Sequence, residues 1–171
     1  MPTETNMSMR DHVEGLAAGG SWYHTALLAH GRLFTGHTPS RRVRDASRWS
    51  ARAKPRWHMC YLNSGEFVLT HKKAEYWEGM WLYAAGDSPT HHAWVVLGGL
   101  VVDFTAEDAA RRVRRRGFDL LPPPEQQYFG LHIPTDVVRQ RVEPTRVCGP
   151  VSPYYLNELI LGHVSVPQTT L

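Results

Sequence analysis

Apolar residues are the majority in two short stretches, 91–97 and 100–105, on either side of the pair Gly98-Gly99. Glycine readily adopts the positive φ angles that two-residue type I′ and II′ turns require, so this pattern predicts a β-hairpin. With a two-residue turn, Leu97 faces Leu100 across the hairpin. The register then fixes which side chains of the hairpin share a face.

Aromatic and aliphatic residues are also dense in 74–84, which predicts a buried strand closed by turn residues at 86–89. A further strand is expected over 131–133. Residues 11–30 fit either two short helices around Gly19-Gly20 or one helix and a turn. The remaining helices are expected in 106–117, 135–141 and 153–161.

Three other segments give less regular patterns. Residues 36–55 are rich in Arg, Ser, Thr and Pro, and this composition predicts an irregular or weakly helical approach to Cys60. The apolar positions of 61–71 fit a helix, but Asn63-Ser64-Gly65 interrupts it, and a glycine inside a helix costs about 1 kcal/mol relative to alanine. Local propensity therefore favours a turn there. Residues 1–10 are polar, and we expect them to be disordered.

Composition places the chain among globular proteins. A length of 171 residues fits one domain, 1–171, in which folding buries roughly 70% of the surface of the unfolded chain. A hydrophobic content of 42% argues against general disorder. The net charge is only +3, yet the cations are sixteen arginines and three lysines. This bias either suits contact with anions or reflects genome composition.

Cysteine usage and the N-terminus point to an intracellular protein. Two cysteines, Cys60 and Cys148, are too few for a disulfide framework, although one bridge between them stays open. The first twenty residues lack the apolar core of a secretory signal, and no apolar run is long enough to cross a membrane. We therefore expect a soluble cytoplasmic protein without a membrane association.

The hairpin brings two chemically important residues together. Side chains alternate between the faces of a strand, so a two-residue turn places His92 and Asp103 on one face as diagonal neighbours, with Cβ atoms about 7 Å apart or less. That separation allows a hydrogen bond between the imidazole and the carboxylate. The same alternation puts His91 on the other face, and a three-residue turn would exchange the two histidines.

Cys60 precedes this pair and completes the residue types of a thiol nucleophile, its base and an orienting carboxylate. A carboxylate on one ring nitrogen fixes the tautomer and leaves the other nitrogen free to take a proton from the thiol. A helix beginning at Cys60 would stabilise the thiolate through its positive N-terminal end. The sequence thus predicts a cysteine-dependent acyl-transfer enzyme with the catalytic residues Cys60, His92 and Asp103.

Other interpretations of the same residues stay open. A single cysteine among apolar neighbours is commonly an inert core residue, and a histidine and an aspartate on one hairpin face can form a structural pair. The first alternative is therefore a catalytically inactive module that binds a peptide or protein partner. The second is a nucleic-acid binder that uses the arginines of 111–116, although no known reader motif accompanies them.

The histidines and cysteines also raise the question of zinc. The chain lacks Cys-x-x-Cys and His-x-x-x-His pairs, whose spacing brings ligands together, so we expect no metal and no cofactor. The residues considered as ligands are His58, Cys60, His91, His92, Asp103 and Cys148.

Five short motifs resemble those of small bacterial and phage proteins with a transglutaminase-like core, which belong to the wider class of papain-like cysteine peptidases. The motifs span about residues 57–134, a little under half of the chain. They consist of Cys60-Tyr61-Leu62-Asn63, Tyr76-Trp77-Glu78-Gly79, His92-Ala93-Trp94, Val102-Asp103-Phe104-Thr105 and Tyr128-Phe129-Gly130. Phe104 stands where these proteins commonly have proline.

The resemblance implies an α+β fold with a transglutaminase-like, papain-like core. In that core an N-terminal helix bearing the nucleophilic cysteine packs on an antiparallel sheet of about four to five strands, and the helix runs through residues 63–65. Cys60 would be the nucleophile, His92 the general base and then acid, and Asp103 the orienting residue. The substrate would be a peptide, a protein or a small amide, with the acyl group passed to water or to an amine.

Further residues are expected to contact the substrate. The backbone N–H of Cys60 is one natural donor to an oxyanion, and Trp57, His58 or Asn63 could supply a second. Glu78 lies in an otherwise aromatic strand, so we expect it to be buried with a partner near the cleft. The predicted substrate-binding residues are Trp57, Asn63, Glu78 and Trp94.

Overall fold

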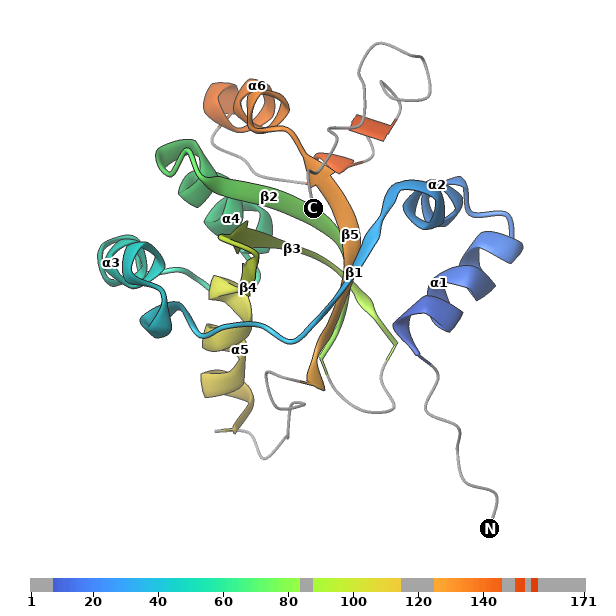
Figure 1. The fold of residues 1–171 in the computed structure, drawn as a ribbon, viewed down its shortest axis with the longest axis horizontal. Coiled ribbons are helices and arrows are strands. Elements are labelled where there is room, and N and C mark those ends of the chain that lie inside the picture. Colours follow the sequence, from blue (N-terminus) through green and yellow to red (C-terminus); the bar gives the residue numbers. More distant parts are fainter. Residues whose placement is uncertain (1–7, 84–87, 115–124, 146–149, 153–154, 157–171) are drawn as a thin grey trace.

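Five antiparallel strands form one curled sheet, which six α-helices surround in the described part of the computed structural model (Figure 1). The structure describes residues 8–83, 88–114, 125–145, 150–152 and 155–156. The strand order is β1-β5-β2-β3-β4, with β1 (Arg32–Thr35), β2 (Ala74–Leu82), β3 (Thr90–Leu97), β4 (Leu100–Val102) and β5 (Gln127–Ile133). The helices are α1 (Met9–Ala18), α2 (Trp22–His30), α3 (Arg44–Ala53), α4 (Cys60–Thr70), α5 (Phe104–Arg114) and α6 (Thr135–Thr145), and a 3-10 turn, η1 (Ser40–Arg42), precedes α3. The architecture is α+β, as expected.

The sheet curls until its two outer strands approach each other. Phe34 of β1 and Trp94 of β3 have ring centroids 6.1 Å apart, although three strand spacings of a flat sheet would be about 14 Å. The segment after β1 reaches β4, since the Thr38 N–H donates to the Val101 carbonyl at 2.7 Å. One face of the sheet is therefore the inside of the curl.

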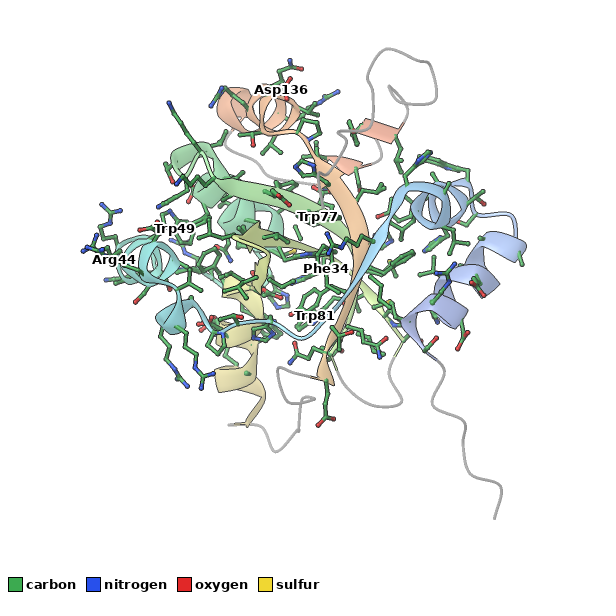
Figure 2. All side chains as sticks on the ribbon, viewed as in Figure 1. Phe34, Arg44, Trp49, Trp77, Trp81 and Asp136 are labelled. Carbon is green, nitrogen blue, oxygen red and sulfur yellow. The ribbon has the colours of Figure 1, made fainter. Side chains whose placement is uncertain are left out.

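Aromatic side chains fill the inside of the curl. Figure 2 shows Phe34, Trp77 and Trp81 gathered in the middle of the molecule, and they form one buried cluster with Trp94 and Tyr128. Each of these five side chains is less than a tenth exposed. The curl thus has a packed core on its inner side, in addition to the core under the helices.

Helix α4 lies on the outer face of the sheet. Phe67 and Val68 of the helix pack with Tyr76 of β2 and with Ala93 and Val95 of β3. Ser64 and Gly65, on the same helix, are also buried. Their small size lets the helix backbone approach the sheet, so tertiary packing outweighs the cost of glycine inside a helix. The helix implied by the family resemblance forms.

Helices α1 and α2 cover the rest of the outer face. Their apolar residues Met9, Val13, Tyr23 and Leu27 form a cluster with Met80, Phe129 and Leu131 of β2 and β5. Ser8 and Asp11 make a reciprocal capping box at the start of α1. The expected disorder of residues 1–10 is therefore wrong for 8–10, because the cap and the burial of Met9 fix the chain there; residues 1–7 lie outside the described part.

The predicted hairpin is confirmed in its register. Leu97 pairs with Leu100 and Val95 with Val102, and Gly98 and Gly99 have φ angles of 59° and 79°. The second strand is shorter than expected. It ends at Val102 because the Asp103 side chain accepts hydrogen bonds from the next N–H groups and starts α5.

Other expected elements differ in extent. Two helices form within 11–30, and β2 and β5 cover the predicted strands at 74–84 and 131–133. Residues 44–53, expected to be irregular or weakly helical, form the regular helix α3 because burial of Ala46 and Trp49 against the core compensates for the polar composition. Strand β1 was not predicted, and most of the predicted helix 153–161 lies outside the described residues.

The position of the cysteine helix also requires a correction. We expected an N-terminal helix to bear Cys60, but α4 is the fourth helix of the chain, after α1 to α3 and strand β1. The first two helices are occupied in covering the outer face of β2 and β5. The residues before Cys60 are therefore part of the folded core, because their helices form a layer on the outer face of the sheet.

Candidate functional site

His92 and Asp103 are in direct contact. The Nε2 atom of His92, on β3, lies 2.7 Å from Oδ2 of Asp103, the residue that follows β4. Both side chains are buried, with exposed fractions of 3% and 1%. His91 points to the other side of the sheet, where its ring lies 5.2 Å from that of Tyr23. The hairpin register therefore selects His92 over its neighbour, as the alternation predicts.

Asp103 is anchored by backbone groups as well as by His92. Its Oδ1 atom accepts hydrogen bonds from the N–H groups of Thr105 and Ala106, at 3.0 and 2.9 Å. Burial alone would raise the pKa of Asp103, but the charge and hydrogen bond of His92 lower it below its ordinary value. The residue is therefore a carboxylate at neutral pH, and it faces the ring in a fixed orientation.

Cys60 is the first residue of α4 and a free thiol, with 8% of its surface exposed. The first N–H groups of a helix have no acceptor within it, and they give this end of the helix a partial positive charge. Cys60 thus lies at the end of α4 where backbone N–H groups are free to bind an oxyanion. Cys148 lies outside the described residues.

Cys60 and His92 approach from opposite faces of the sheet. His92 points to the inside of the curl, where its ring stacks on Trp81 at 4.4 Å, whereas Cys60 belongs to the outer cluster with Ala93. The faces meet at the edge of β3, because β4 pairs only with residues 95–97 and, among the described residues, leaves 90–94 open on that side. Across this edge the Cys60 thiol is close enough to the ring to raise the pKa of His92.

The contacts of His92 favour its protonated form. Burial by itself lowers the pKa of His92, but the charge and hydrogen bond of Asp103 and the nearby Cys60 thiol raise it above its ordinary value. Since Nε2 is used by Asp103, Nδ1 is the ring nitrogen that remains for the thiol. This is the arrangement in which an imidazole can hold a proton taken from sulfur.

Sequence reasoning gave no role to two residues on the far side of Asp103. The hydroxyl of Tyr128 lies 3.1 Å from Asp103 Oδ2 and 3.0 Å from Nδ1 of His37. Burial and the charge of Asp103 raise the pKa of Tyr128, so the phenol keeps its proton and its O–H donates a hydrogen bond to the carboxylate. Burial lowers the pKa of His37, whose neutral ring can donate from Nδ1 to the phenol oxygen. Only the curl brings these residues together, so no local sequence signal could have found them.

Two of the predicted substrate-binding residues lie in the loop and helix around Cys60. The Asn63 amide donates to the Arg56 carbonyl at 2.8 Å and to Thr105 Oγ1 at 2.9 Å, so its hydrogens hold the chain before Cys60 against the start of α5. Trp57 is half-buried, its ring stacks on that of His58 at 3.6 Å, and its backbone N–H donates a hydrogen bond to Asp108 Oδ2 at 3.1 Å. His58 has a positive φ of 64°, an unusual conformation two residues before the thiol.

The other two predicted residues are fully buried. Trp94 has no exposed surface and packs against Gly130, which argues against contact with a substrate. Glu78 points to the face opposite His92, and its carboxylate accepts the N–H groups of Val151 and Ser152 at 2.7 to 2.9 Å. Its expected burial with a partner is present, but that partner is a backbone segment of the chain itself.

Neither a metal-binding cluster nor a membrane-spanning helix is present among the described residues. No group of three or more His, Cys, Asp or Glu side chains is arranged there to hold a metal ion. No helix in the same part of the chain has both the length and the apolar character of a membrane span. Of the arginines in 111–116, only the side chain of Arg112 is described, and it pairs with Asp108 at 2.9 Å.

Comparisons with known proteins give no independent assignment. The chain matches no protein-family model, no curated protein and no solved structure. The resemblance to transglutaminase-like proteins therefore stays a prediction from short motifs, and the function has to be argued from the geometry of the site.

Proposed function

We propose that the protein is a cysteine-dependent acyl-transfer enzyme of the transglutaminase-like type, acting on amide or thioester bonds. Cys60 is the nucleophile, His92 the general base and acid, and Asp103 the residue that orients His92. The observation that carries this proposal is a buried imidazole whose Nε2 atom holds a carboxylate and whose pKa the nearby Cys60 thiol raises.

The reaction begins with transfer of the thiol proton to Nδ1 of His92, while Asp103 stabilises the imidazolium. The sulfur attacks the carbonyl carbon, and the bond between that carbon and the leaving nitrogen breaks as His92 returns the proton to the nitrogen. The product is a thioester on Cys60 and a free amine. Water or a second amine then gives up a proton to His92 and takes the acyl group, which restores the thiol.

The negative charge of the tetrahedral intermediate needs donors. The N–H of Cys60, at the first position of α4, is suited to this because the helix provides no acceptor for it. The Asn63 side chain contributes indirectly, since it fixes the preceding loop. Burial of the site excludes bulk water and so strengthens both effects.

The first test measures alkylation of Cys60 by iodoacetamide across pH, in a Cys148→Ser background. The alkylation rate of the parent protein should reach half of its maximum at a pH at least about one unit lower than the rate of His92→Ala does, because the imidazolium stabilises the thiolate. His91→Ala is the matched control, since it removes the adjacent histidine on the opposite face, and it should leave the profile unchanged. Equal profiles for the parent and His92→Ala would overturn the proposal.

A second readout separates an activated thiol from an enzyme. Incubation with p-nitrophenyl acetate should transfer an acetyl group to Cys60, visible as a mass increase on the peptide that contains it, and Cys60→Ala and His92→Ala should not acquire it. An activated thiol that never forms or releases an acyl adduct would point instead to the inactive binding module.

A further inference from the structure

A strongly basic surface lies beside the segment that leads to Cys60. It is formed by the exposed side chains of η1, α3 and the turn after them, and Asp45 is the single acidic residue among 41–56. We call it the arginine surface, and its members are Arg41, Arg42, Arg44, Arg48, Arg52, Lys54 and Arg56. Figure 2 shows Arg44 on the outer side of α3, away from the sheet.

The cations of the arginine surface are not used by the fold. Arginines form ion pairs elsewhere in the described part of the chain, such as Arg10 with Glu14 and Arg112 with Asp108, and neither of these two pairs belongs to this surface. None of the seven side chains has another interaction. Guanidinium groups left in water at this density are available to an anion.

The charge pattern works against the stability of α3. Arg44, Arg48 and Arg52 repeat at intervals of four, which brings like charges together on one side of the helix. Arg44 also lies in the first turn, where the helix dipole disfavours a cation, and the N-cap residue Val43 provides no side-chain hydrogen bond. The helix is held by its buried side, through Ala46 and Trp49, so folding does not explain the arginines.

The arginine surface is close to the candidate nucleophile. Trp49, on the buried side of α3, packs in the same cluster as Cys60, and Asn63 ties the backbone of Arg56 to α4. A helix with its side chains is about 10–12 Å wide. An extended peptide at about 3.3 Å per residue crosses that width in roughly four residues, so one chain can touch the thiol and the arginines together.

We propose that the arginine surface binds an acidic segment of the polypeptide on which Cys60 acts, so the assignment of this partner as a substrate rests on the proposed function. The planar guanidinium group binds a carboxylate through two parallel hydrogen bonds. Single-stranded nucleic acid is less well matched, because it uses free aromatic faces. The nearby ring of Trp57 is already stacked on His58 and lies under the guanidinium of Arg112.

The test is binding of a fluorescent peptide of about twelve residues, with alternating glutamate and glycine, to the full chain carrying Cys60→Ala. We expect binding at about 20 mM salt that weakens as salt is added. The charge-reversal variant R44E/R48E/R52E should bind about threefold to a hundredfold more weakly. The control R32E/K72E/K73E makes the same change in net charge with exposed residues elsewhere and should bind within about twofold of the parent.

Three results would overturn this assignment: no peptide binding at low salt, equal losses in the two triple variants, or tighter binding of a thymidine oligonucleotide of similar charge. The variant R44Q/R48Q/R52Q removes the three positive charges without adding negative ones, and it should also bind the peptide more weakly than the parent. Circular dichroism of this variant checks that α3 stays folded. The binding assay uses Cys60→Ala and therefore does not depend on catalysis. Peptide binding can be judged even if the parent protein proves to have no acyl-transfer activity.

Discussion

Asp103 has two separate structural roles. Its Oδ2 atom holds His92, and its Oδ1 atom caps α5 through the N–H groups of Thr105 and Ala106. The same side chain thus links the orientation of the imidazole to the start of a helix. Because the two roles use different oxygens, two substitutions can separate them.

Asp103→Ala removes both roles, and Asp103→Asn keeps an oxygen for the cap. We expect the free energy of unfolding to fall by about 2–4 kcal/mol in Asp103→Ala, from the lost cap and an unpaired buried imidazole, and by roughly half of that in Asp103→Asn. Both variants should lose the low-pH reactivity of Cys60 to the same extent. Asp103→Ala has no carboxylate to stabilise the imidazolium, and in Asp103→Asn the amide favours the His92 tautomer with its proton on Nδ1. Urea unfolding and iodoacetamide alkylation measure the two effects, and equal stabilities of the two variants would contradict the capping role.

At the scale of elements, the contact between β2 and β5 depends on glycine. A Cβ atom at Gly79 would lie 2.1 Å from the Phe129 carbonyl oxygen and 2.4 Å from Gly130 Cα, both backbone atoms. Neither atom can move without separating the strands. Gly79 is also the residue paired with His92, so the close approach lies beside the candidate site.

Gly79→Ala should therefore destabilise the protein by about 3 kcal/mol or more, since the backbone has to shift to admit one methyl group. Gly15→Ala is the matched control. Gly15 lies in α1 with no atom near its added Cβ, and alanine there should stabilise the protein by about 0.5–1 kcal/mol. Thermal and urea unfolding compare the two, and a neutral Gly79→Ala would show that β2 and β5 are not packed this closely.

At the scale of the whole molecule, Glu78 joins the sheet to a distant part of the chain. Its carboxyl group, 1% exposed, accepts the N–H groups of Val151 and Ser152. Burial is the main cause that raises the pKa of Glu78, while the hydrogen bonds of Tyr76, Val151 and Ser152 lower it. The native state therefore keeps a proton on Glu78 at pH values where the unfolded chain has lost it.

This difference makes part of the stability depend on pH. Protonated Glu78 makes its full contribution to the unfolding free energy below about pH 4.5, the ordinary pKa of the carboxyl group in the unfolded chain. This contribution is lost as the pH rises through the raised pKa of the native state. The unfolding free energy of the parent relative to Glu78→Gln should therefore decrease above pH 4.5, by at most about 1.4 kcal/mol per pH unit. Urea unfolding at a series of pH values measures this slope, with Glu14→Gln as the control for removal of an exposed carboxylate. Parallel curves for the parent and Glu78→Gln would rule out the raised pKa.

Local sequence was sufficient where a short-range rule applied. Gly98-Gly99 specified the turn, the turn specified the register, and the register put His92 and not His91 beside Asp103. Each step depends on residues within about a dozen positions of one another. By contrast, residues 63–65 formed a helix against local propensity, because burial against the sheet outweighs the cost of about 1 kcal/mol for a glycine inside a helix.

What the sequence by itself determined is the hairpin and the pairing of an imidazole with a carboxylate, since turn chemistry and side-chain alternation act through neighbouring residues; the α+β class was implied by the resemblance of short motifs. What only the tertiary structure decided is the curl of the sheet and its consequences. The curl brings Tyr128 and His37 to Asp103, and the early end of β4 leaves the edge of β3 open beside His92. These contacts join segments far apart in the chain, and they are fixed by the packing of whole layers, which no local pattern records.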